Sequence, residues 1–160
     1  MLKKPTLKQK DDDVSHAFNA ALGYLTAREY SKADLSKKLL LRYTKEAVAD
    51  AIKKCIEYDY LSDSRYASIL SKHIINQGYG PKRLLLEAFK HQVNSKLFAK
   101  VIDETCWQSV AVAYLNKKLK GSVDYDYAQK QKILAMLSRR GFSNSICLEA
   151  LEQYLSENEQ

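Results

Sequence analysis

Three residues typical of helix N-caps, Thr44, Asn94 and Ser143, recur along this chain at intervals of 50 and 49 residues. A side chain of this kind accepts a hydrogen bond from the first free backbone N–H groups of a helix. Apolar residues stand at the same offsets from each cap: nine before, one before, four after and eight after. These columns contain Leu35, Leu85 and Leu134; Tyr43, Val93 and Phe142; Val48, Phe98 and Cys147; and Ile52, Ile102 and Leu151. The pattern predicts a helical unit copied three times, with each unit burying its face partly against the next.

The rest of the sequence also favours helices. The chain has only five glycines and two prolines, and its apolar residues recur three and four positions apart. Strand alternation and hairpin turn dipeptides are missing. We therefore expect an all-α fold of three tandem three-helix repeats, similar to helix-turn-helix units, in an elongated curved array. The expected helices cover residues 14–26, 31–42, 45–58, 62–77, 81–91, 95–105, 106–119, 125–139 and 144–155.

The caps and helices together predict five segments. A flexible N-terminal segment with basic and acidic residues is expected over residues 1–13, and an acidic tail over 156–160. The three repeats lie between them, at residues 14–61, 62–105 and 106–155.

The formal net charge is +7, and each expected repeat carries part of the excess. A basic excess spread along the whole chain favours a polyanionic partner that is contacted over a long surface. A soluble basic protein without such a partner is the alternative.

The chain start lacks the apolar centre of a signal peptide, and no apolar run reaches membrane-spanning length. We therefore expect a cytoplasmic protein. The three cysteines are odd in number and widely separated, and no pair has metal-ligand spacing. They are expected to be free and mostly buried, with Cys147 packed inside because it falls in an apolar column.

The segment NQGYGPKRLLLE, residues 76–87, holds two of the five glycines and one of the two prolines. Gly78 suits the left-handed position that ends a helix, Gly80 suits an N-cap, and Pro81 suits the first helical position. No strand precedes the glycines and no Gly-Lys-Ser/Thr follows them, which argues against a nucleotide-binding P-loop. The segment is interpreted as the boundary between two helices.

Lys82 and Arg83 are not explained by that boundary. Basic residues in the first turn oppose the helix dipole by about 0.3–1 kcal/mol each when exposed. Because both residues stand where the helix dipole disfavours basic side chains, we expect them to have a functional role, which is to meet acidic groups on a partner. Removing their charge should then weaken binding and leave the fold as stable or slightly more stable.

Other candidate sites have simpler explanations. His73 and His91 lack a second ligand at metal spacing, so we expect core or capping histidines. The acidic trio at residues 11–13 is expected to precede a helix N-terminus, where negative charge is favourable. No Ser or Cys pairs with a base at a recognisable spacing, so the sequence offers no catalytic residue, and it offers no cofactor or metal site either. Trp107 is expected in the core, whereas Tyr79, between two glycines, is open to stacking on a base.

Three short motifs resemble the signatures of the RecX family. Residues 25–31 read LTAREYS and are followed by Asp-Leu at 34–35 and Lys-Leu at 38–39, as in the first signature. DSRYA at residues 63–67 with GYGP at 78–81 resembles the second signature, and RRGF at 139–142 resembles the third. The order and spacing agree over about residues 17–155. The resemblance implies a non-enzymatic protein of tandem three-helix repeats without a cofactor. Such a protein lodges in the groove of the RecA–DNA filament and restrains the recombinase, ATPase and co-protease activities of RecA in recombination and SOS repair.

The resemblance implies RecA and its nucleoprotein filament as partners. We also expect weak non-specific contact to DNA, no membrane association and a monomeric chain. The candidate partner-binding residues are basic: Lys82, Arg83, Arg28, Arg65, Lys117, Lys118, Arg139 and Arg140. The alternative function is sequence-tolerant DNA binding by a helix-turn-helix protein that acts without RecA. Against it, the helices after the three caps share no Arg, Asn or Gln pattern that would read bases.

Overall fold

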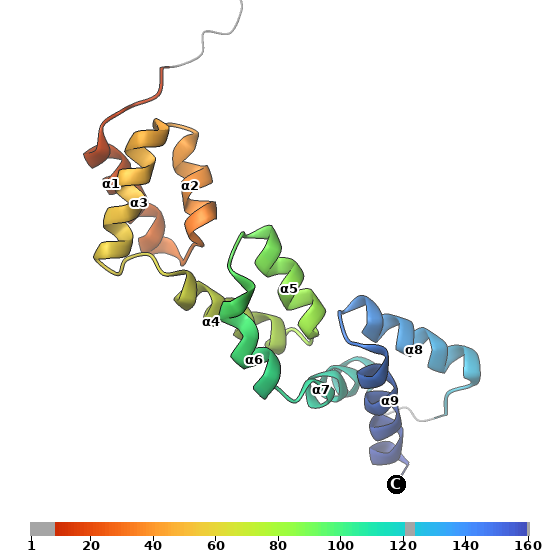
Figure 1. Ribbon diagram of the computed structural model, residues 1–160. Helices are drawn as coiled ribbons and strands as arrows, with labels where there is room; N and C mark the ends of the chain where they lie inside the picture. The colour runs from red at the N-terminus through yellow and green to blue at the C-terminus, as the bar shows by residue number, and fades with distance from the viewer. Residues whose placement is uncertain (1–8, 121–123, 160) are drawn as a thin grey trace, which may run out of the picture. The chain divides into compact units, whose positions relative to one another are not determined.

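The structure is a computed structural model that describes residues 9–120 and 124–159. Over these residues the chain is all-α, as the sequence predicts, with nine α-helices and one 3-10 helix (Figure 1). The helices are α1 (Val14–Ala27), α2 (Lys32–Leu40), α3 (Lys45–Glu57), α4 (Asp63–Asn76), α5 (Pro81–Lys90), η1 (Ser95–Phe98), α6 (Ala99–Glu104), α7 (Trp107–Leu119), α8 (Tyr127–Arg139) and α9 (Asn144–Asn158). The sixth expected helix is thus divided, because its first turn is the 3-10 helix η1.

The packing divides the chain into two compact units. The first contains the described residues up to Tyr66 together with His91–Val93. In it α1 packs against α3, and α2 packs against both. Its buried core includes Leu35 and Ile52 and also the Tyr30 ring.

The second unit contains Ala67–Lys90 and the described chain from Asn94 onward. Here α7 and α8 both pack against α9, while η1 contacts α5 and α6. Phe98, Phe142 and Tyr154 are fully buried in this unit. Trp107 is a core residue, as expected, and its indole N–H donates to the Ile102 carbonyl at 2.9 Å.

The three predicted N-caps are confirmed. The Thr44 hydroxyl accepts a hydrogen bond from the Ala47 N–H at the start of α3. Ser143 accepts one from the Ile146 N–H at the start of α9. Asn94 opens the 3-10 helix η1 in the same way and accepts from the Lys96 N–H at 3.0 Å.

The apolar column nine residues before the caps is only partly correct. Leu35 is fully buried, with 0% exposure, whereas Leu85 in the middle copy is 41% exposed. The buried residue of α5 is instead Leu84, and in α8 it is Ile133. The second helix of the first copy is therefore shifted by one residue relative to the other two.

The turn that follows each helix explains this shift. After α2 the Tyr43 N–H donates to the carbonyl of Leu39, four residues earlier. After α8 the Phe142 N–H donates to the carbonyl of Leu137, five residues earlier, and Gly141 takes a left-handed φ of 94°. The turn after α2 is therefore one residue shorter than the turn after α8. As a result, the buried residues of α2 lie one residue closer to the following N-cap than those of α8 do.

The acidic residues near the N-terminus precede a helix, as predicted. The Asp13 carboxylate caps α1 by accepting from the Ser15 and His16 N–H groups. The backbone of Asp11 pairs with Arg42 and Thr44 in the turn between α2 and α3, where it forms an isolated bridge. Of the N-terminal segment expected over 1–13, residues 1–8 lie outside the described part of the chain.

At the other end of the chain, α9 continues to Asn158, three residues beyond its expected end. Gln160, the last residue of the expected acidic tail, lies outside the described residues.

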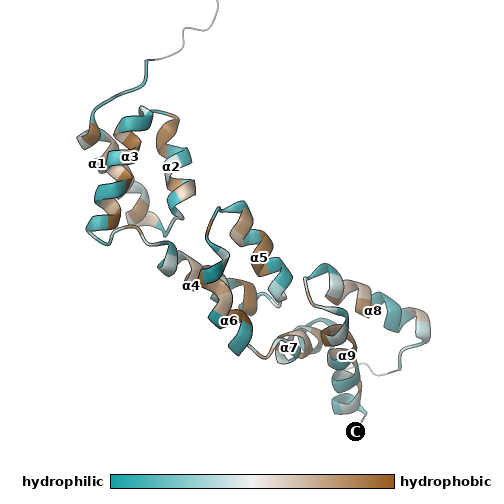
Figure 2. Cartoon of the chain, in the orientation of Figure 1, coloured by the Kyte–Doolittle hydropathy of each residue, from teal (hydrophilic) through white to brown (hydrophobic). Residues whose placement is uncertain are grey.

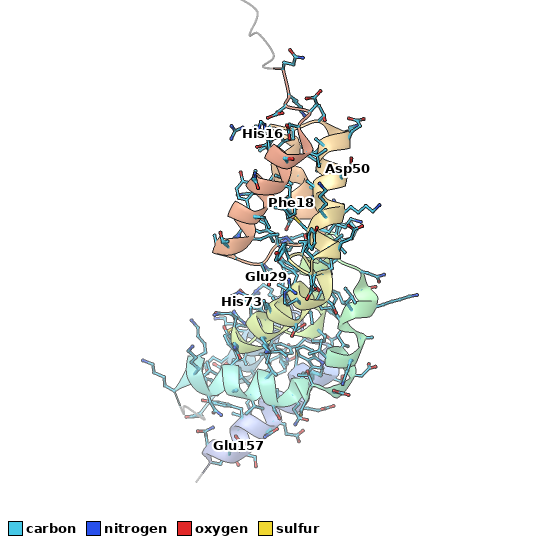
Figure 3. The ribbon with its side chains drawn as sticks, turned by 90° about the vertical axis from the view of Figure 1, so that its left-hand side faces the viewer. His16, Phe18, Glu29, Asp50, His73 and Glu157 are labelled. Carbon is cyan, nitrogen blue, oxygen red and sulfur yellow. The ribbon has the colours of Figure 1, made fainter. Side chains whose placement is uncertain are left out.

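The histidines differ from one another. His73, labelled in Figure 3, is exposed on α4, so the expectation of a core or capping role was wrong for this residue. The adjacent Ile74 is buried, but Ile69, one turn earlier, is 49% exposed, so position 73 lies on the outer side of α4. His91 is half-buried, and its ring Nδ1 hydrogen-bonds the Asp34 carboxylate. Among the described residues no three His, Cys, Asp or Glu side chains gather as metal ligands would. None of the described helices combines the length and the apolar character needed to cross a membrane.

The cysteines differ in exposure, and this gives a first prediction. Cys55 and Cys147 are buried, and burial raises the pKa of both thiols. Cys106 is exposed, and its hydrogen bond with the Ser109 hydroxyl lowers the pKa of the thiol. Because the thiolate is the reactive form, a maleimide should modify Cys106 rapidly in the native protein and the other two only after unfolding.

A Cys106→Ser variant is the control for this experiment and should show no fast labelling. Replacing Cys147 by serine should lower the free energy of unfolding by about 1–3 kcal/mol, since it buries a hydroxyl in an apolar site. Rapid modification of Cys147 in the folded protein would contradict its place in the core.

Candidate partner-binding surface

The glycine-rich segment before α5 forms the boundary that the sequence predicts. Gly78 ends α4 with a left-handed φ of 70°, and Gly80 directly precedes α5, which begins at Pro81. The structure adds a second role for Gly80, as a contact to the turn between α8 and α9. Its N–H donates to the Arg140 carbonyl at 2.9 Å, and the Lys82 N–H donates to the Gly141 carbonyl at 3.1 Å. The turn between α8 and α9 thereby satisfies a free N–H at the start of α5.

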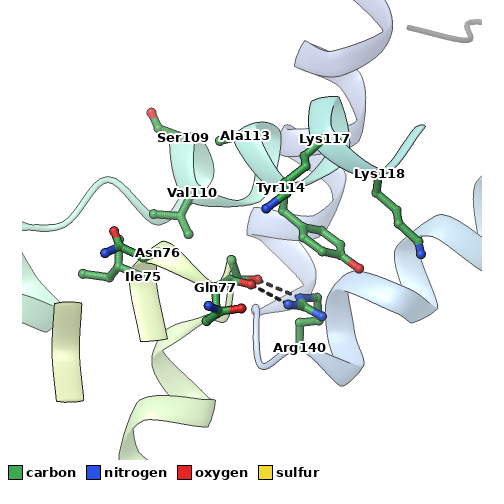
Figure 4. A pocket seen from close by; sticks show the side chains of 11 residues that line it. Ile75, Asn76, Gln77, Ser109, Val110, Ala113, Tyr114, Lys117, Lys118 and Arg140 are labelled. Carbon is green, nitrogen blue, oxygen red and sulfur yellow. Dashed lines mark hydrogen bonds between the residues drawn. The ribbon is translucent and has the colours of Figure 1, made fainter. Parts of the chain in front are cut away.

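Arg140 also joins the turn between α8 and α9 to the end of α4, and we refer to this set of contacts as the junction. Its Nε donates to the Gly78 carbonyl at 2.9 Å and its Nη2 donates to the Gln77 carbonyl (Figure 4). The guanidinium also lies 4.1 Å from the ring centroid of Tyr79 and 4.0 Å from that of Tyr114. A cation at the carboxyl end of α4 complements the helix dipole, so Arg140 caps that helix from a distant part of the chain.

Arg83 is also engaged within the protein. Its Nη2 lies 2.9 Å from a carboxylate oxygen of Glu87 one turn along α5, and its guanidinium lies 5.2 Å from the centre of the Tyr79 ring. The Arg83 Nε is buried and has no hydrogen-bond partner within the described structure. The expectation that the fold does not depend on Arg83 stays a prediction, and the pairing of Arg83 with the mostly buried Glu87 argues against it.

In the first unit Arg65 has a comparable structural role. Its Nε donates to the Glu29 carboxylate at 2.7 Å, and its Nη1 donates to Asp59 at 3.3 Å. The hydrogen bond to Glu29 raises the pKa of Arg65 above its ordinary value. Glu29, labelled in Figure 3, lies in the loop between α1 and α2 and is mostly buried. Arg65 thus balances a charge that would otherwise be unpaired.

The remaining candidates are exposed. Arg28 lies over the Tyr30 ring at 4.5 Å from its centroid, in the first unit. Lys82 and Arg139 project from the start of α5 and the end of α8 in the second unit. Lys117 and Lys118 lie in the last turn of α7, where positive charge complements the helix dipole. No ion pair joins either lysine to a described residue of the chain.

Three of the candidates line one open groove in the second unit, of about 750 Å³. Lys117, Lys118 and Arg140 lie at one end of it, around the Tyr114 ring, as Figure 4 shows. The groove's other lining residues come from the carboxyl end of α4 and from α7: Ile75, Asn76, Gln77, Gly78, Ser109, Val110 and Ala113. An anionic group with an apolar neighbour fits this combination of lysines and aliphatic side chains.

The sequence leaves Tyr79 open to stacking on a base, but the protein's own arginines lie over its ring. Both Arg83 and Arg140 lie over it. Tyr79 is half-buried. Its sequence neighbours Gly78 and Gly80 were the one available signal that another part of the chain approaches closely at this point.

Comparison with known proteins places these motifs in a family. Sequence models of the first and third three-helix domains of RecX match residues 17–55 and 108–151. The regulatory protein RecX of Stenotrophomonas maltophilia (strain R551-3) is 32% identical over 141 residues, which is 86% of each chain. The chain belongs to the RecX family. The RecX protein of Legionella pneumophila (strain Corby) is 30% identical over 146 residues, covering 89% of this chain and 97% of its own.

A solved structure supports the fold. The crystal structure of RecX from Lactobacillus salivarius superposes with a TM-score of 0.72 at 23% identity, over 88% of this chain and 96% of its own. RecX proteins are regulatory proteins and not enzymes, in agreement with the absence of a catalytic motif from the sequence.

The geometry gives the RecX signatures a structural meaning. In the first unit, Glu29 of the first signature pairs with Arg65 of the second. In the second unit, Gly80 of the second signature meets Arg140 and Gly141 of the third. Residues of different signatures therefore contact one another where one three-helix repeat meets the next. The candidate partner contacts lie beside these residues on the exposed surface.

Proposed function

We propose that this chain binds the RecA recombinase and its filament on DNA and restrains recombinase, ATPase and co-protease activity. The proposal rests on membership of the RecX family, at 32% identity over 86% of the chain. It is supported by Lys117 and Lys118, which are exposed beside the groove in the second unit and form no ion pair with the residues that the structure describes. They offer positive charge to phosphates or carboxylates of the filament.

Within this proposal the exposed basic residues make the partner contacts and the paired ones position them. The contacts are assigned to Arg28, Lys82, Lys117, Lys118 and Arg139. Arg65, Arg83 and Arg140 act through the junctions that they stabilise. The protein is proposed to act as a cytoplasmic monomer, with weak and non-specific contact to DNA.

We also propose the repeat boundaries that the sequence suggested, at residues 14–61, 62–105 and 106–155. The matched first and third three-helix domains lie inside the first and last of these ranges. The loops before α4 and α7 lie at the two internal boundaries.

A charge-reversal experiment tests the lysines. Changing both Lys117 and Lys118 to glutamate should weaken binding to a filament of RecA on single-stranded DNA several-fold or more, because steering and close charge pairs change sign. Inhibition of the RecA ATPase should weaken in parallel. If the lysines meet phosphates, each lost contact should flatten the slope of log affinity against log salt by about 0.7.

The control carries the same change in net charge at other exposed lysines, Lys54→Glu on α3 with Lys132→Glu on α8. Equal loss in both double variants would mean that only net charge matters and that the groove is not a contact. If the parent binds bare duplex DNA far more tightly than it binds the filament, DNA binding without RecA is the better description.

A further inference from the structure

The helix α5 has an apolar face that the protein leaves uncovered. Its inward face buries Leu84 and Ala88, one turn apart. On the outward side Leu85 is 41% exposed, Leu86 47% and Phe89 80%. Leu97 of η1, which contacts α5, is also exposed. Figure 2 shows the resulting hydrophobic run along α5. We refer to Leu85, Leu86, Phe89 and Leu97 as the α5 patch.

The other second helices show that the fold does not require this patch. Aligned on their buried residues, position 86 of α5 corresponds to Lys37 in α2 and to Ala135 in α8. Position 89 corresponds to Ser138 in α8 and to the half-buried Leu40 in α2. Because a lysine and a serine serve at equivalent sites, the exposed Leu86 and Phe89 have no evident role in stabilising the chain itself.

The charges around the patch define what it can bind. Lys82 and Lys90 stand at the two ends of α5, and Lys96 precedes Leu97 on η1; all three are exposed. The one acidic residue of α5, Glu87, is mostly buried and pairs with Arg83 and Lys90. The border of the patch is therefore basic, and a complementary surface has an apolar centre with carboxylates at its border.

We propose that the α5 patch is a docking site for a protein partner that presents an apolar segment bordered by aspartate or glutamate. This inference rests on the proposed function, in which that partner is a RecA subunit of the filament and not the DNA. Leucine side chains gain from burial against apolar protein surface, whereas contacts to nucleic acid are mainly to phosphate and sugar. A second copy of this chain would bring the same lysines together, which disfavours self-association through the patch.

The test is a double substitution, Leu86→Ala with Phe89→Ala. Buried apolar anchors at an interface centre contribute most of the binding energy, so affinity for the filament should fall at least about tenfold. Far-UV circular dichroism and the urea midpoint should stay unchanged because both side chains are exposed. Affinity for bare single-stranded DNA should also stay unchanged. The matched control removes exposed apolar side chains elsewhere, Leu41→Ala with Tyr127→Ala, and should bind as the parent does.

A photo-crosslinking amino acid in place of Phe89 identifies what covers the patch. It should form an adduct with a RecA subunit and none with the DNA. An adduct with DNA, or equal loss of DNA affinity in the alanine variant, would overturn the inference. So would a parent that sediments as a dimer and a variant that sediments as a monomer.

The outcome also separates this inference from the proposed function. If the parent binds the filament and the alanine variant binds equally well, the α5 patch is not the docking site and the proposed function stands. If the parent fails to bind the filament at all, the proposed function fails and the RecA assignment of the patch fails with it.

Discussion

Replacing Gly80 by alanine is expected to lower the free energy of unfolding of the second unit by about 3 kcal/mol. A Cβ atom at this position would lie 2.4 Å from the Gly141 carbonyl oxygen and 2.7 Å from the Phe142 nitrogen. Both are backbone atoms, which cannot move aside as a flexible side chain can. The turn between α8 and α9 would have to separate from the start of α5, and the hydrogen bonds from Gly80 and Lys82 would be lost.

Gly141→Ala should be similarly destabilising for two reasons. Its φ of 94° disfavours any L side chain, and its Cβ would lie 2.6 Å from the Arg83 nitrogen. The lone tryptophan, Trp107, lies in the second unit, so its fluorescence during urea unfolding reports on the unit in question.

Gly23→Ala is the matched control. Gly23 lies in α1, and a Cβ there would meet no atom within 4 Å. This substitution should therefore stabilise the helix by about 0.5–1 kcal/mol. If Gly80→Ala unfolds at the urea concentration of the parent, the close approach of the two turns is not a feature of the folded protein.

The helices and their ends could be predicted from sequence because local chemistry decides them. The caps Thr44 and Ser143 and the boundary at Gly78 and Pro81 depend on residues within one or two turns of each other. The one-residue shift of α2 could not be predicted in the same way. It depends on whether the following turn contains a left-handed residue, and only Gly141 made such a turn visible in the sequence.

The roles of the basic residues were harder to predict. Arg139 and Arg140 are adjacent and chemically identical, yet one is exposed and the other is fixed between two tyrosine rings. The partners of Arg140 lie 62 and 63 residues away in sequence, beyond the reach of helical periodicity. The same holds for Arg65 and Glu29, which are 36 residues apart. A charge pattern indicates a basic surface but not which charges are used within the fold.

Arg140→Ala is expected to lower the free energy of unfolding of the second unit by about 2–4 kcal/mol. The substitution removes a charged donor from the Gln77 and Gly78 carbonyls and removes the guanidinium from the Tyr79 and Tyr114 rings. It also uncaps the carboxyl end of α4. Trp107 fluorescence in urea again provides the measurement.

Two further variants distinguish a junction residue from a surface charge. Arg139→Ala removes the same charge from the exposed neighbour and should change stability by no more than about 0.5 kcal/mol. Arg140→Lys keeps the charge, but an ammonium group lacks the planar fork that reaches two carbonyls while lying over two rings. It should therefore recover only a small part of the loss. If Arg140→Ala is as stable as Arg139→Ala but binds the filament less well, Arg140 belongs among the partner contacts and not among the residues that hold the repeats together.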